Sequence, residues 1–91
     1  MLKLKDGIGV PVQLTFKDLY KLEKENPELA EEYFNLQAKD KLNELDMVKV
    51  VYIGYLCAGN EKISFEDFLD RISNNRNETL SVYYDLIYPK N

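Results

Sequence analysis

The sequence predicts a mainly α fold, in which four to five helices pack around a central apolar helix at about residues 44–58, preceded by a short N-terminal β-hairpin. Residues 47–58 are apolar at every position except Lys49 and Gly54, which is typical of a helix buried on all sides. Two Ser/Thr-x-x-Asp motifs elsewhere in the chain are typical of helix N-termini. Both observations favour a helical bundle.

The chain of 91 residues is expected to form a single domain, 1–91, with a hairpin over 1–14 and helices over 15–91. A chain of this length has room for only one hydrophobic core. Its composition, which is 45% hydrophobic, is sufficient to fill that core.

The hairpin is predicted from imperfect apolar alternation over residues 2–14 around Asp6-Gly7, a dipeptide favoured in tight turns. The expected second strand carries Val10, Val12 and Leu14. Pro11 lacks a backbone N–H, so it is expected on the edge side of this strand.

A first helix is predicted over about residues 15–25, opened by a capping box between Thr15 and Asp18. Its apolar positions recur at helical spacing. They are Phe16, Leu19, Tyr20 and Leu22.

A second helix is expected to begin at Pro27, because the residue before a proline is disfavoured in the α conformation and proline suits the first helical position. Leu29, Tyr33 and Leu36 form its expected apolar face, and the place of Phe34 is left open. The two helices form either an antiparallel pair or one kinked helix.

The central helix follows a polar stretch at residues 39–46 and is expected to end at Gly59-Asn60, which serve as the C-cap. Its apolar run is too short to cross a bilayer. No membrane partner is expected.

Two further helices are predicted after the central one. Ser64 and Asp67 form a second capping box. The apolar face of this helix is Phe65, Phe68, Leu69 and Ile72, and residues 73–77 form a loop. The last short helix has Leu80, Tyr83, Tyr84 and Ile87 as its apolar positions and is closed by Pro89.

Composition narrows the classes of function. The net charge is −4, which lacks the basic footprint of a phosphate binder, so no nucleic-acid partner is expected. Histidine is absent and Cys57 is the single cysteine, which removes imidazole chemistry and an internal disulfide. No enzyme activity, catalytic residue or cofactor is expected. The N-terminus lacks a signal-peptide h-region, which favours a cytoplasmic protein.

Metal and acid–base sites are weighed and set aside. The run from Gly59 to Phe68 resembles the second half of an EF-hand, but Leu56, Ala58 and Glu61 occupy essential loop positions, so no metal site is expected. Asp18, Glu66, Asp67 and Asp70 have the spacing that helix N-termini require for capping. Cys57 is expected to be a small buried hydrophobe.

The tyrosines are the candidates for protein contact. Tyr52 and Tyr55 are expected in the core. For Tyr83, Tyr84 and Tyr88, core packing and partner binding are equally supported, because a ring with a polar tip suits a site that a partner partly buries. The candidate contact residues are therefore Tyr83, Tyr84, Ile87 and Tyr88.

One family shares this order of elements. The hairpin, the segment Thr15–Glu25, the aliphatic and tyrosine-rich segment Leu45–Ala58 and the segment Ile63–Leu69 together resemble the tail assembly chaperones of long-tailed (siphovirus-type) phages and prophages of Gram-positive bacteria. The resemblance spans nearly the whole chain. Its most specific part is the central helix ending in Cys-Ala-Gly-Asn, followed by Ser-Phe-Glu-Asp-Phe-Leu.

The resemblance implies a non-enzymatic role in building a phage tail. Members of the family bind the tape measure protein, shield its apolar surface and help to recruit the major tail protein. They act in the host cell cytoplasm and are absent from the mature virion. Many of their genes also encode a longer form through a minus-one frameshift, and Pro89-Lys90-Asn91 can be encoded CCA AAA AAC, which contains a slippery heptamer.

Three alternatives remain open. The first, which the resemblance implies, is an assembly chaperone, and it predicts self-association or client binding through apolar helix faces. It is instead an acidic helical regulatory module that blocks a basic or nucleic-acid-binding partner, with salt-sensitive binding. A degenerate EF-hand calcium sensor is the third alternative, and it predicts stabilisation by millimolar calcium.

Overall fold

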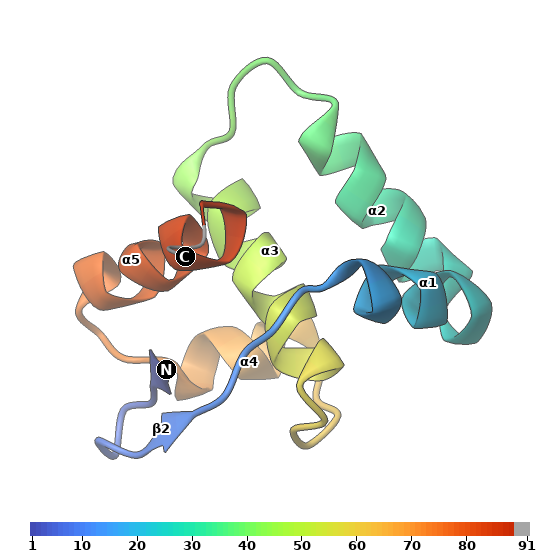
Figure 1. Cartoon of the computed structure of the whole chain (residues 1–91). Helices are drawn as coiled ribbons and strands as arrows, with labels where there is room; N and C mark the ends of the chain where they lie inside the picture. Colours follow the sequence, from blue (N-terminus) through green and yellow to red (C-terminus); the bar gives the residue numbers. More distant parts are fainter. Residues whose placement is uncertain (89–91) are drawn as a thin grey trace.

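The computed structural model describes residues 1–88 (Figure 1). Within them the regular elements are β1 (Leu2–Lys3), β2 (Gly9–Val10), α1 (Phe16–Glu25), α2 (Pro27–Gln37), α3 (Glu44–Cys57), α4 (Phe65–Arg71) and α5 (Arg76–Ile87). The predicted fold class is confirmed: the domain is mainly helical and has a short N-terminal hairpin. None of the helices in this part of the chain has the length and hydropathy to cross a membrane.

Helix α3 forms the centre of the core. Figure 1 shows α5 on one side of it, the α1–α2 pair on the other and α4 beside its C-terminal half. Every α3 residue from Val50 to Tyr55 is buried, as expected for a helix that is apolar on all sides. Gly54 permits close approach, since a Cβ there would lie 3.0 Å from Leu86 Cδ1 of α5.

The hairpin pairs Leu2 with Val10 and Lys3 with Gly9 in antiparallel register. Its turn contains the predicted Asp6-Gly7 dipeptide, and Gly7 adopts φ +85°, a conformation that favours glycine. The opposite side of β1 is also used, because Ser73 N–H donates to Lys3 O at 3.0 Å. The first strand is thereby fixed between β2 and the segment that follows α4.

The second strand is shorter than predicted, since it ends at Val10 and excludes Val12 and Leu14. Pro11 has no N–H to donate to a β-ladder. The following residues cross α3 instead, where Gln13 N–H donates to Gly54 O at 3.1 Å. The predicted alternation of residues 10–14 therefore reflects an extended segment lying over a helix.

Helices α1 and α2 are separate and pack against each other. Asn26 lies between them and is both the C-cap of α1 and the N-cap of α2. The predicted capping box at the start of α1 is confirmed: Asp18 N–H donates to Thr15 Oγ1 at 3.1 Å, and Thr15 N–H donates to Asp18 Oδ2 at 2.9 Å.

The predicted apolar face of α1 is partly wrong. Leu22 is buried, but Phe16 is 91% exposed and Tyr20 is 61% exposed. Asp18 and Leu22 lie on the side of α1 that packs against the domain. Phe16 and Tyr20, which are one turn apart, lie on the other side of the helix and point away from the domain. Phe34 on α2, whose place the sequence left open, is also exposed.

Helix α3 begins with a capping box that the sequence analysis missed. Asp46 N–H donates to Asn43 Oδ1 at 2.8 Å, and Asn43 N–H donates to Asp46 Oδ2 at 3.1 Å. The helix ends close to the predicted residue, and Gly59 follows with φ +84° as a left-handed cap.

The ends of α4 and α5 differ from the prediction. At the start of α4, Asp67 N–H donates to Ser64 Oγ at 3.1 Å, as predicted for the first bond of the box. Within residues 1–88 the second bond, from Ser64 N–H to the Asp67 carboxylate, is not formed, so the predicted capping box is only half present. Ile72 does not continue α4: it is extended and forms a β-bridge with Leu4. The expected loop at 73–77 is shorter because Asn75 caps α5. Pro89, predicted to close α5, lies outside the described residues.

Candidate protein-binding surfaces

The structure separates the candidate contact residues of α5 into two groups. Tyr83 is only 7% exposed and belongs to the core, so it is not available on the surface of the folded chain. Tyr84 is 50% exposed and Tyr88 is 70% exposed, while Ile87 is half-buried. Adjacent positions on a helix face different directions, which explains why neighbouring tyrosines have different environments. Whether the exposed members contact a client stays a prediction.

The three tyrosine rings form a continuous series along α5. The ring of Tyr83 meets that of Tyr84 edge-on at a centroid distance of 5.3 Å. The rings of Tyr84 and Tyr88 are stacked, with centroids 6.5 Å apart and planes 19° apart. Burial raises the pKa of the Tyr83 phenol, with smaller contributions from the neighbouring tyrosines. The exposed Tyr84 ring therefore contacts the buried Tyr83 ring on one side and the exposed Tyr88 ring on the other.

A second apolar surface lies on α3 and α4, which we call the α3–α4 groove. It consists of two hollows that share Leu45, a mostly exposed residue in the first turn of α3. One hollow, of about 360 Å³, is lined by Phe65 and by Leu36 of α2. The other, of about 410 Å³, is lined by Leu69 and by Leu80 of α5.

Charged side chains at this groove are paired with one another. Lys49 Nζ lies 3.3 Å from a carboxylate oxygen of Glu32 and 4.5 Å from the centre of the Phe65 ring. At the other hollow, a guanidinium nitrogen of Arg76 lies 3.8 Å from Glu44. The apolar lining of the groove is therefore bordered by charged side chains that pair with one another.

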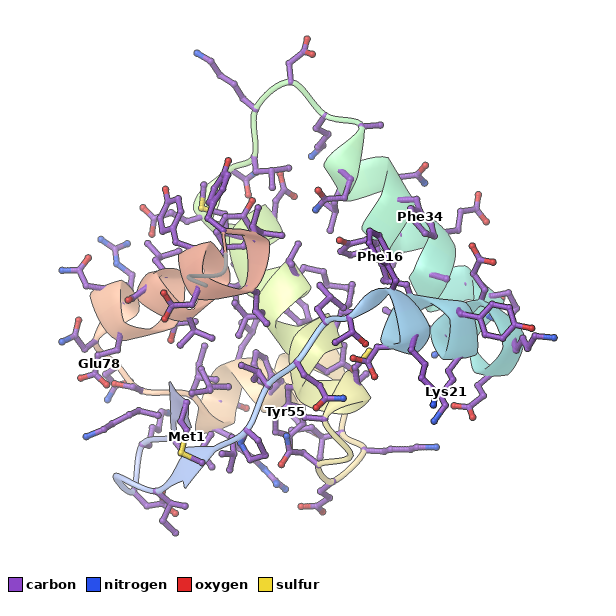
Figure 2. The ribbon with its side chains drawn as sticks, in the orientation of Figure 1. Met1, Phe16, Lys21, Phe34, Tyr55 and Glu78 are labelled. Carbon is purple, nitrogen blue, oxygen red and sulfur yellow. The ribbon has the colours of Figure 1, made fainter. Side chains whose placement is uncertain are left out.

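The sequence analysis missed a third surface, the outer face of α1. It exposes the rings of Phe16 and Tyr20, and Figure 2 shows Phe16 and Phe34 projecting from the α1–α2 pair. The ammonium of Lys24 lies 5.0 Å from the centre of the Tyr20 ring, a cation–π contact. The sequence carried no signal for this surface, because only the structure shows that the side of α1 with Asp18 and Leu22 faces the domain.

A hollow of about 480 Å³ between the α1–α2 pair and the end of α3 contains the single cysteine. Burial, together with the nearby carboxylates Asp18 and Glu25, raises the pKa of the Cys57 thiol to about 11. A thiol with this pKa is a weak nucleophile at neutral pH because little thiolate forms. Cys57 is only partly buried, although it packs against the core as expected.

The carboxylates considered for acid–base chemistry are dispersed. Asp18 is buried and serves the cap of α1, whereas Glu66, Asp67 and Asp70 are exposed on α4. Burial opposes ionisation of Asp18, but hydrogen bonds from Thr15 and Gln13 outweigh it and lower the pKa of this carboxyl. Within residues 1–88, no group of three or more His, Cys, Asp or Glu residues is placed to hold a metal ion.

Comparison with known proteins adds no relative: no family model matches the chain, and neither a curated protein nor a solved structure matches it.

Proposed function

We propose that this chain is a tail assembly chaperone of a long-tailed phage or prophage, a non-enzymatic protein that binds the tape measure protein and helps tail tube assembly. The observation that carries the proposal is the α5 stripe, a surface at the C-terminal end of α5 where the exposed rings of Tyr84 and Tyr88 accompany the half-buried side chain of Ile87. The resemblance in the order of elements supports the same role. In this proposal the chain acts in the host cytoplasm with the major tail protein and is absent from the mature virion.

The α5 stripe suits a helical client. Its members recur at helical spacing, so their rings and branched side chain can pack along one apolar face of an amphipathic helix. Tyrosine provides a large apolar area with few rotatable bonds and keeps its hydroxyl in water. The stacked arrangement of Tyr84 and Tyr88 already orders both rings, which lowers the entropy lost when a partner binds.

The acidic character of the chain is compatible with this role. A protein that exposes aromatic surface needs charge to stay soluble, and a net charge of −4 opposes non-specific aggregation. Binding and shielding an apolar client require contact surface and no reacting group. The function therefore fits the surfaces that the domain presents.

The direct test is co-purification of the chain with the tape measure protein after co-expression. We expect Tyr84→Asp to weaken co-purification strongly, because a charge would be placed in an apolar contact. Phe34→Asp is the matched control, since it introduces a carboxylate at a comparably exposed aromatic residue of α2, on the other side of α3. Circular dichroism checks that both variants remain helical.

Each result of this test is informative. Loss of binding in Tyr84→Asp and retention in Phe34→Asp support the α5 surface. Equal retention in both variants, with both remaining helical, contradicts it. Absence of any complex with the wild-type chain contradicts the proposed function itself.

The gene provides an independent test. The nucleotide sequence around and after the last codon is expected to show a slippery heptamer at Lys90-Asn91, an overlapping reading frame and then a very long frame with apolar heptads. Codon AAG at Lys90 would remove the heptamer. Absence of both the heptamer and the long downstream frame argues against a tail assembly role.

One observation favours a second function, that of an acidic regulatory module. Glu66, Asp67 and Asp70 are all exposed on α4, which creates a local negative surface for a basic partner. Such binding would weaken steeply with salt, because exposed charges are screened. Tape measure binding through Tyr84 and Tyr88 would depend far less on salt, so a salt titration of any complex distinguishes the two functions.

A further inference from the structure

The outer face of α1 combines aromatic and positive side chains. Phe16 and Tyr20 are one helical turn apart, which separates them by about 6 Å along the axis. Lys17 and Lys21 follow them by one position and are exposed at the same spacing. Figure 2 shows Phe16 and Lys21 projecting outward on different sides of α1. A basic stripe thus runs beside an aromatic stripe, in a chain of net negative charge.

Helix α4 carries the complementary pattern. Phe65 and Leu69, again one turn apart, line the two hollows of the α3–α4 groove on either side of Leu45. Glu66 and Asp70 follow them by one position and are exposed. An acidic stripe therefore runs beside two apolar hollows, with the same repeat of about 6 Å that α1 shows for its rings and lysines.

We propose that α1 of one copy of this chain docks antiparallel to α4 of a second copy, in the α3–α4 groove. The Phe16 ring then enters the hollow beside Leu69, and the Tyr20 ring enters the hollow beside Phe65. A nearly fully exposed phenylalanine thereby becomes buried, which supplies the hydrophobic part of the binding energy.

The positions of the charges select the antiparallel direction. In both helices the charged residue follows the apolar one, so the charged stripe is rotated by about 100° in the same sense around each axis. When two helices face each other, stripes with this offset lie on the same side of the contact only if the helices run in opposite directions. Lys17 then meets Asp70, and Lys21 meets Glu66.

These four charges are available for such pairing. Within residues 1–88, neither the two lysines of α1 nor the two carboxylates of α4 take part in an ion pair, whereas Lys49, Arg71 and Arg76 each do. The neighbouring arginine and lysine of the groove are thus occupied by carboxylates of their own chain. Both halves of a matching contact are present in one sequence, and this favours a second copy as the occupant.

The proposed contact joins two different surfaces. A single contact of this kind is heterologous, so repetition in one direction generates a ring or a chain of copies, whereas reciprocal use closes a dimer. The inference does not rest on the tail assembly proposal, because Tyr84, Ile87 and Tyr88 line neither hollow of the groove and take no part in the proposed contact.

The test measures the mass of the full chain by light scattering over a wide range of concentrations. We expect wild-type mass to rise with concentration at low salt and to rise less at high salt. The double variant Lys17→Glu/Lys21→Glu and the double variant Glu66→Lys/Asp70→Lys should each associate about tenfold or more weakly, because like charges would face each other.

Mixing the two double variants is the decisive experiment. The acidic α1 of one variant faces the basic groove of the other, and the unchanged α1 and groove also complement each other, so association should recover toward the wild-type level. Lys3→Glu/Lys5→Glu is the matched control for the α1 variant. It makes the net charge more negative by the same amount as Lys17→Glu/Lys21→Glu, but on the exposed hairpin, and it should associate almost like wild type.

Several results overturn the proposal. They are a wild-type chain that stays monomeric at every concentration, double variants that associate as well as wild type, and a mixture that shows no recovery although both variants remain folded by circular dichroism. Binding of a different protein to α1 without self-association would identify another occupant and also overturn it.

Discussion

Adjacent tyrosines on α5 should have very different effects on stability when each is replaced by alanine. A buried tyrosine removes about 150–250 Å² from water, and burial is worth roughly 25 cal/mol per Å². Tyr83 is almost fully buried, so this product gives about 4–6 kcal/mol as an upper bound. This range overlaps the roughly 3–5 kcal/mol measured for other aromatic truncations in cores. We expect Tyr83→Ala to cost about 3–4 kcal/mol.

Tyr84→Ala should cost much less, about 1 kcal/mol or below. Half of this side chain is already in water, and its ring contacts come from Tyr83 and Tyr88, residues of the same helix. Both positions lie inside α5, so the gain in helix propensity from alanine is the same in the two variants and cancels in their difference.

Urea unfolding followed by circular dichroism at 222 nm measures this difference, and thermal unfolding should show Tyr83→Ala melting roughly 10–20 °C below Tyr84→Ala. A cost for Tyr84→Ala equal to that for Tyr83→Ala would refute the reasoning, because Tyr84 would then belong to the core. Loss of client binding in Tyr84→Asp would in that case report unfolding rather than a lost contact.

Three further predictions follow from buried groups. Asp18→Asn should lower the free energy of unfolding by about 1 kcal/mol at neutral pH. Because the folded pKa of Asp18 is lowered, the carboxylate contributes stability above the unfolded pKa of 3.8, and this contribution is lost as pH falls through the folded pKa. In acid titrations the variant should therefore lose stability less steeply than wild type below about pH 4. Thr79→Val should raise the free energy of unfolding by about 1 kcal/mol in urea titrations. Thr79 is 2% exposed and its hydroxyl has no hydrogen-bond partner among residues 1–88, so valine removes an unpaired buried polar group. A destabilised variant would show that this hydroxyl forms a hydrogen bond in the folded protein. Alkylation of Cys57 at pH 8 should be about tenfold or more slower than alkylation of a free thiol. A pKa of about 11 instead of 9.0 lowers the thiolate fraction about a hundredfold, and the greater nucleophilicity of a more basic thiolate restores only part of the lost rate. Alkylation as fast as that of a free thiol would contradict the assigned burial.

The core could be predicted from sequence where a single element carries the whole signal. The run from Met47 to Ala58 is apolar around its full circumference, so no orientation has to be chosen, and residues Val50–Tyr55 are buried as expected. Thr15 could be identified as an N-cap because the bonds of a capping box join residues three apart. Both inferences depend only on neighbours in sequence.

The remaining features depend on contacts between distant segments. Helix α1 has two apolar stripes, and periodicity cannot decide whether Leu22 or Phe16 faces the domain. Ile72 continues the apolar spacing of α4, yet it forms a bridge with Leu4 at the other end of the chain. Tertiary pairing overrides local periodicity in both cases.

The same limitation explains the candidate site. Neighbouring residues Tyr83 and Tyr84 have identical side chains, and only the orientation of α5 against α3 buries one and exposes the other. The α3–α4 groove was not predicted because its lining comes from several helices that are far apart in sequence, with Leu36 on α2, Leu45 on α3, Phe65 on α4 and Leu80 on α5. Sequence pattern identifies which residues are apolar, and packing decides which of them remain available to a partner.

The two proposed surfaces reinforce each other physically. Contact between α1 and the α3–α4 groove would bring successive copies together without using Tyr84 or Tyr88, which line neither hollow of the groove. For an elongated client with repeated apolar faces, a bound copy raises the effective concentration of the next one, so two weak contacts combine into tight coverage. The two surfaces should therefore fail separately. Tyr84→Asp should abolish client binding and leave self-association intact. Lys17→Glu/Lys21→Glu should leave each copy able to bind the client but make coverage of a long client less cooperative. Titration of the chain against tape measure fragments of increasing length separates these effects, because wild-type affinity per copy should rise with length and that of the charge variant should stay constant.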